Sequence, residues 1–139
     1  MKNFRNALKY LIPVIVLVMV VGLILSRVYQ PEPSVPGPEI SITAFEASEH
    51  VGKHAEVCGR VASAEYIRRI GGEPTFLNLG RSYPDQPFTV VIWGEDRSRW
   101  RVPPDERYLS HDICVTGEIR MHEDVPQIRA RNPDQIRSW

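Results

Sequence analysis

The sequence predicts an all-β domain behind an apolar N-terminal helix, and three observations support this. Five short segments rich in β-branched and aromatic residues follow one another from residue 54 to residue 133. Turn residues separate them, and two of the segments carry an interior glycine, which favours a bulge or a sharp bend. An uncharged stretch precedes them all. Five short strands, with a long connection between the third and the fourth, predict a small closed barrel.

The uncharged stretch, residues 10–26, reads YLIPVIVLVMVVGLILS. As a helix it would be about 26 Å long, near the lower limit for crossing a bilayer. We therefore expect a transmembrane anchor over residues 10–27. A cleaved signal peptide is the alternative, although the small residues that a cleavage site needs are poorly placed here.

Basic residues flank this stretch unequally. Lys2, Arg5 and Lys9 precede it, whereas Arg27 alone follows it closely. The positive-inside rule then places residues 1–9 in the cytoplasm as a short tail. The remainder of the chain would lie in the periplasm or outside the cell.

The net charge of zero hides a division along the chain. Four of the 17 basic residues, and none of the 17 acidic residues, lie in residues 1–27. The rest of the chain thus has four more acidic than basic residues, which argues against strong non-specific binding of nucleic acid. Its basic residues are arginines except for Lys53. Arginine suits phosphate contacts and base stacking, but genome composition could produce the same bias.

A proline-rich segment, residues 28–41, separates the anchor from the folded part. Four prolines and a glycine predict an extended, semi-rigid spacer. The folded domain is then expected over residues 42–139.

The domain is expected to open with a short helix over residues 44–51. Thr43 and Glu46 have the spacing of a capping box, in which each residue satisfies a free N–H group near the helix start. We expect Phe45, and with it Val51, on the buried side of this helix.

The strands are expected over residues 54–66, 75–80, 88–94, 111–121 and 125–133. Alternating apolar residues place Val57 and Val61 on the inward face of the first of them. Gly59 between them predicts a bulge or a bend.

These segments together resemble a known family. The resemblance lies in the motifs GKHAEVCGRV, PTFLNLG, FTVVIWGEDR, DICVTGEI and PQIRARNPDQI, within residues 42–137. They resemble the OB-fold nucleic-acid-binding domains, and among these the small bacterial barrels related to the anticodon-binding domain. The resemblance implies a five-stranded barrel, strands one and four side by side, and a ligand face on strands two and three.

The second and third strands carry the candidate ligand-binding residues. If the leucines of TFLNL point inward, Phe76 and Asn78 lie on the outer face, where an aromatic ring can stack on a base. Arg81 and Tyr83 in the connecting loop could contact a phosphate and a base. Trp93 ends the third strand. The alternative is that the preceding helix or the following loop covers these aromatic rings.

Three further arginines could extend this surface. Arg60 on the first strand and Arg129 and Arg131 on the fifth are expected to face outward. They could form a cationic track for a nucleic-acid backbone. The alternative is a solvated face in which they pair with Glu56 and Glu118.

The two cysteines face the same way on neighbouring strands of the expected barrel. Cys58 and Cys114 lie opposite the inward rows of strands one and four. Together with an oxidising compartment, this favours a cross-strand disulfide. Two reduced, half-buried thiols are the alternative.

Catalytic and metal-binding motifs are not apparent in the sequence. His50 and His54 have the spacing of a helical metal site, but Gly52 interrupts a helix there. We identify no nucleophile with its base, no paired carboxylates and no phosphate loop. We therefore expect a non-catalytic protein without a cofactor.

Two other function classes are compatible with an anchored barrel. A haem chaperone of this architecture is disfavoured. That family holds haem with an H-x-x-x-Y motif, and no tyrosine stands at the required position after His122. A protein-interaction scaffold in the cell envelope suits the acidic domain better than binding of free DNA does. The leading expectation is binding of single-stranded DNA or RNA, with an envelope protein as the alternative partner.

Overall fold

The computed structural model describes residues 2–29 and 37–139. The chain divides into two compact units, residues 1–35 and residues 36–139. The described residues of the first unit form one helix, α1 (Lys2–Val28), with Pro13 in its interior. By length and composition, its segment Asn6–Val28 could cross a membrane. Half of the expected spacer, residues 30–36, lies outside the described residues.

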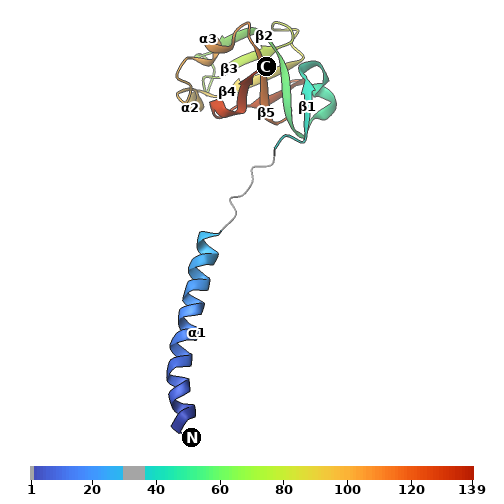
Figure 1. Cartoon of the computed structure of the whole chain (residues 1–139). Helices are drawn as coiled ribbons and strands as arrows, with labels where there is room; N and C mark the ends of the chain where they lie inside the picture. The colour runs from blue at the N-terminus through green and yellow to red at the C-terminus, as the bar shows by residue number, and fades with distance from the viewer. Residues whose placement is uncertain (1, 30–36) are drawn as a thin grey trace. The chain divides into compact units, whose positions relative to one another are not determined.

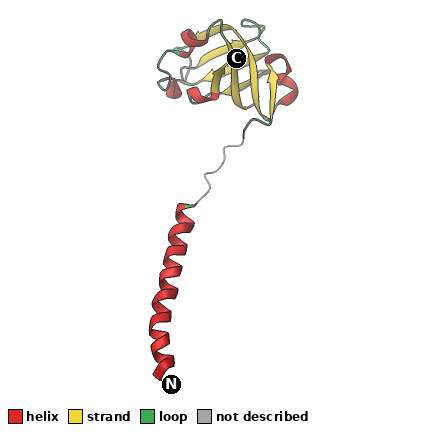
Figure 2. Ribbon diagram, viewed as in Figure 1, coloured by secondary structure: helices red, strands yellow, loops and turns green. Residues whose placement is uncertain are grey.

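The second unit consists of short strands with small helical segments between them (Figure 1). The strands are β1 (Ile40–Thr43), β2 (His54–Tyr66), β3 (Thr75–Leu79), β4 (Phe88–Ile92), β5 (Asp112–Glu118), β6 (Arg120–His122), β7 (Val125–Arg129) and β8 (Ile136–Ser138). The helical segments are η1 (Ala44–His50), α2 (Gly94–Arg97), α3 (Pro104–Tyr108) and η2 (Pro133–Gln135). Figure 2 shows these helical segments at the periphery of the strands.

The strands form one mixed sheet of eight strands within the described residues, in the order β6-β7-β4-β3-β2-β5-β8, with β1 beside β2. The long strand β2 connects the two halves of the sheet. Its first part pairs with β1 and β5, and its last part pairs with β3. Strand β4 pairs in parallel with β7. The expected contact between strands one and four is present as the antiparallel β2–β5 pair.

The prediction of a closed five-stranded barrel is wrong in two respects. The strands β1, β6 and β8 have only three or four residues, too few to show a period of two in the sequence. The sheet is also open, since no ladder joins β5 to β7 in the part of the chain that the structure describes. The side chain of Gln135 lies between these strands, and its Nε2 donates to the carbonyls of Thr116 (3.0 Å) and Arg129 (3.2 Å).

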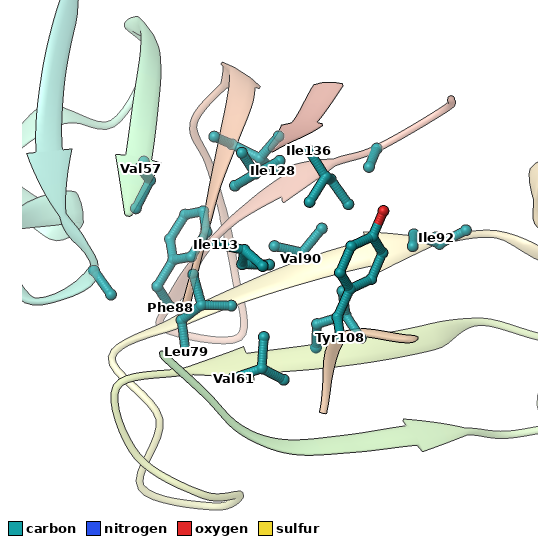
Figure 3. Packing of buried hydrophobic residues seen from close by; sticks show 14 of the residues in the cluster. Val57, Val61, Leu79, Phe88, Val90, Ile92, Tyr108, Ile113, Ile128 and Ile136 are labelled. Carbon is teal, nitrogen blue, oxygen red and sulfur yellow. The ribbon is translucent and has the colours of Figure 1, made fainter. Parts of the chain in front are cut away.

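The core lies between the two halves of the curved sheet (Figure 3). Val61 from β2, Val90 from β4 and Ile113 from β5 are completely or almost completely buried there. Tyr108 of α3 covers one side, and its hydroxyl accepts a hydrogen bond from Trp100 Nε1 at 3.1 Å. The buried residues of this cluster all belong to residues 44–136, so the second unit has a core of its own.

Candidate nucleic-acid interface

The outer face of β3 and β4 is less open than the sequence suggested. Asn78, expected to be exposed, is 4% exposed. Its amide donates to Ser63 Oγ at 3.0 Å and accepts from Thr89 Oγ1 at 3.0 Å. The same Ser63 oxygen accepts the backbone N–H of Tyr83 at 3.0 Å, so the β3–β4 loop is tied to β2 beside this polar row. Asn78 therefore joins strands and is not available to a ligand.

Phe76 lies on the same outer face and is half-buried. Its neighbours across the sheet are Glu65 on β2 and Val91 on β4. The ring is partly accessible, next to a carboxylate on one side and a fully buried valine on the other.

Two exposed aromatic rings lie at the β3–β4 loop. Tyr83 is 71% exposed, and Phe45, expected to be buried, is 56% exposed. The guanidinium of Arg81 lies 5.4 Å from the centre of the Phe45 ring, in cation–π contact. Below them is Gly80 with a φ of +86°, where a Cβ atom would lie 3.0 Å from the Phe45 ring. We call Phe45, Arg81 and Tyr83 the loop patch.

The prediction that Phe45 is buried is wrong, because the helix has a different period from the one expected. The segment η1 is a 3₁₀ helix, with three residues per turn. Ala44 and Ala47, three residues apart, are therefore the residues that face the core. The capping box is present, with the Thr43 N–H donating to Glu46 Oε2 at 2.8 Å. This hydrogen bond, together with one from the Thr43 hydroxyl at 2.7 Å, holds the pKa of Glu46 below its usual value.

A small cleft lies at the other end of β3 and β4. It has a volume of about 300 Å³ and is lined by Gly72, Trp93, Glu95 and Arg129. Trp93 is half-buried, and its ring packs so closely on Gly72 that a Cβ atom there would lie 2.8 Å away. We call these four residues the Trp93 cleft. Gly72 and Glu95 were not identified from the sequence, because they are distant in the chain and carry no motif.

Two carboxylates hold Arg129 in this cleft. Its Nη2 donates to Asp96 at 2.9 Å and also to Glu95. The bond to the buried Asp96 raises the pKa of Arg129 most, and the bond to Glu95 adds to it. The positive charge of Arg129 is thus offset within the protein.

The arginines do not form a continuous cationic track. Arg60 lies 3.6 Å from Asp112, so its ion pair differs from the one expected. Arg131 is exposed and makes no ion pair within the described residues, but its carbonyl accepts from Arg99. The two glutamates expected as partners bind other arginines, Glu56 with Arg137 and Glu118 with Arg120.

The structure joins Cys58 and Cys114 in a disulfide across β2 and β5. Both cysteines are buried, and the Glu56 carboxylate lies within 4.8 Å of both sulfurs. Among the described residues this is the one group of three potential metal ligands. Because the sulfurs are bonded to each other, neither is a thiolate that could bind a metal.

Comparisons with known proteins do not assign the chain to a family. No family model matches the chain, and no curated protein matches it. One solved structure that resembles it is from Leishmania major Friedlin and is described as an aspartyl-tRNA synthetase. The identity is 16%, the TM-score is 0.44, and the match covers 78% of this chain and 22% of that protein. The sheet itself, with its β2–β5 and β4–β7 pairs, is OB-like and open on one side.

Proposed function

We propose that this protein is a membrane-anchored, non-catalytic module that binds single-stranded nucleic acid. The loop patch is the observation that supports this most directly. It offers two exposed rings and an arginine at the edge of the β3–β4 face. Rings on which bases stack, next to a cation that meets the backbone, are what proteins use to bind single strands.

The anchor in this proposal is α1. The helix is long and apolar enough to span, and the basic residues of the sequence favour an N-terminus in the cytoplasm. Residues 28–41 would then act as the spacer, and the domain from residue 42 onward would lie outside the cytoplasm.

The charge distribution predicts modest affinity. In the loop patch, Arg81 is the cation placed to meet a phosphate, while most candidate arginines elsewhere are paired with carboxylates. Each neutralised phosphate contributes a slope of about −0.7 to the dependence of log K on log salt for single strands. We therefore expect a shallow salt dependence, of one to two phosphates, with stacking supplying most of the binding energy.

The test is fluorescence anisotropy of labelled single-stranded 12-mers of DNA and RNA, across a salt series. The protein is the fragment 31–139, which contains the complete core of the second unit. We expect Tyr83→Ala and Phe45→Ala each to weaken binding about fivefold to tenfold, the lower end of the range of about 1–3 kcal/mol per stacked base. Arg81→Ala should weaken binding and reduce the salt slope by about one phosphate.

The control variants remove similar groups elsewhere. Val102→Ala shortens an exposed apolar side chain, and Arg101→Ala removes an exposed arginine that has no ion pair within the described residues. Both should leave binding unchanged. If the folded fragment binds no oligonucleotide at low salt, the proposal is wrong. The acidic balance of the domain would then favour the second candidate, a scaffold for an envelope protein partner.

A further inference from the structure

The Trp93 cleft differs in chemistry from the loop patch. We propose that it binds a guanine base of the single strand, an inference that rests on the proposed function. The strand pairs Leu79–Phe88 and Thr75–Ile92 mark the two ends of the β3–β4 hairpin, about 13 Å apart along the strands. Arg81 and Tyr83 of the loop patch lie in the loop after the first pair, and Trp93 follows the second pair. A short oligonucleotide that lies along the hairpin can therefore reach both.

The cleft is a poor site for phosphate. Glu95 is 72% exposed, and its residue is one of the four that line the cleft. The charge of Arg129 is already offset by Glu95 and Asp96. An anion would thus meet the exposed Glu95 carboxylate and gain little from the arginine, whose charge is already paired. A neutral, planar, polar group does not have this difficulty.

The cleft offers such a group a ring, an acceptor and a donor. The indole of Trp93 provides a surface for stacking, and the Glu95 carboxylate provides oxygen acceptors. Arg129 uses Nη2 for both of its carboxylate bonds, and its Nε is buried with no partner among the described residues. Because the Nε atom is buried, a ligand cannot reach it, and the Nη1 group is the N–H donor of Arg129 that remains for a base.

Guanine is the base that best matches these groups. Its Watson–Crick edge has a carbonyl oxygen next to two adjacent donors, N1–H and the 2-amino group. Arg129 can donate to the carbonyl oxygen while Glu95 accepts from the two donors. In thymine and uracil, two carbonyls flank the single N–H and would face the carboxylate. Adenine and cytosine each present one amino group next to a ring nitrogen acceptor.

The experiment compares three labelled 12-mers: twelve thymidines, the same strand with one central guanosine, and the same strand with inosine there. Inosine lacks only the 2-amino group. We expect the guanosine strand to bind fragment 31–139 about tenfold more tightly than the thymidine strand, as for a good bidentate contact. The inosine strand should fall between them. Glu95→Ala should remove the preference, whereas Trp93→Leu should weaken binding of the guanosine strand.

The control is Glu106→Ala, which removes an exposed carboxylate from α3 and should keep the preference. Unfolding curves of all variants establish that they fold. Equal binding of the three strands overturns the guanine site and leaves the proposed function intact. Absence of binding by any strand overturns both. Binding of a labelled oligo-arginine peptide that Glu95→Ala abolishes, without a guanine preference, would instead assign the cleft to a cationic side chain.

Discussion

The side chain of Gln135 donates a hydrogen bond to the backbone carbonyl of Thr116 at 3.0 Å, across the opening between β5 and β7. The same nitrogen donates to the carbonyl of Arg129, and the amide oxygen accepts the N–H of Arg131 at 2.7 Å. One side chain thereby satisfies backbone groups on both sides of the opening. An open sheet leaves such groups without partners, and a buried group without a partner costs about 1–3 kcal/mol.

Gln135→Ala should therefore lower the free energy of unfolding by about 1–2 kcal/mol, because the carbonyls of the half-buried Thr116 and Arg129 lose a donor. Gln135→Glu should be worse, since a carboxylate cannot donate and would face two carbonyl oxygens. Urea unfolding of fragment 31–139 measures both. Asp134→Ala, next to it on the exposed side of η2, serves as the control. Equal effects at the two positions would show that the hydrogen bonds of the Gln135 side chain do not stabilise the fold.

A second test concerns Gly117 on β5. A Cβ atom at this position would lie 2.6 Å from Cγ2 of Ile128 on β7. Gly117→Ala should therefore destabilise the domain by about 1–3 kcal/mol through overpacking. In the background of Ile128→Ala, which removes the contacting atom, the same change should cost much less. The measurement is a double-mutant cycle on unfolding free energies, and additive effects would contradict it.

The matched control is Gly71→Ala. A Cβ atom there meets nothing within 4 Å, and the residue has no positive φ. The substitution should leave stability unchanged or raise it slightly, by restricting the unfolded chain.

The sequence predicted the long elements because their periodicity is strong. The bounds 54–66 of the first strand agree with β2, and Val57 and Val61 are buried as expected. The bulge was misplaced: the register shifts between Val61 and Ser63. Gly59 is instead a close approach, since a Cβ atom there would lie 3.2 Å from Ala44. A glycine in a strand fits both readings, and only the packing against η1 distinguishes them.

The site was harder to predict than the fold, because exposure depends on tertiary contacts. Asn78 has the alternation of an outward residue, yet the row with Ser63 and Thr89 buries it. Trp93 and Arg129 were identified from the sequence, but Gly72 and Glu95 enter the same cleft only through the fold. The alternation thus predicted which residues lie on the outer face, but not which of them are covered by neighbours from other strands.

The disulfide is the subject of the third prediction. Cys58 and Cys114 are 56 residues apart, and closing a loop of this length stabilises a fold by about 4 kcal/mol in the chain-entropy model. The double variant Cys58→Ala, Cys114→Ala should lose about 3–4 kcal/mol, because small apolar side chains fill part of the buried space. The measurement compares its urea unfolding with that of the oxidised protein. The protein reduced by dithiothreitol is a second comparison and should show a similar loss. If neither the variant nor the reduced protein is destabilised, the bridge is not stabilising this fold.

The last prediction concerns the ion pair of Glu56 and Arg137, which joins β2 to the C-terminal strand β8. The Arg137 guanidinium donates to Glu56 through Nε at 2.8 Å and through Nη2 at 2.7 Å. The hydrogen bonds from Arg137 hold the pKa of Glu56 below its ordinary value of 4.5. A carboxyl group whose pKa is lower in the folded state stabilises the fold above its unfolded pKa, and this contribution is lost as the pH falls through the folded value. Stability should therefore be constant in this respect near neutral pH and decline below about pH 4.5.

Glu56→Gln should remove this part of the acid sensitivity. At pH 7 we expect it to cost about 1 kcal/mol or less, because the Arg137 side chain is 55% exposed and the pair is screened by solvent. Between pH 3 and pH 5 the stability of the variant should change less steeply than that of the unmodified domain. The control is Glu118→Gln, since Glu118 pairs with Arg120 at 3.2 Å on the surface and both side chains are about half exposed or more. Thermal unfolding at intervals of half a pH unit gives the three curves, and parallel curves for Glu56→Gln and the unmodified domain would contradict the assignment to this pair.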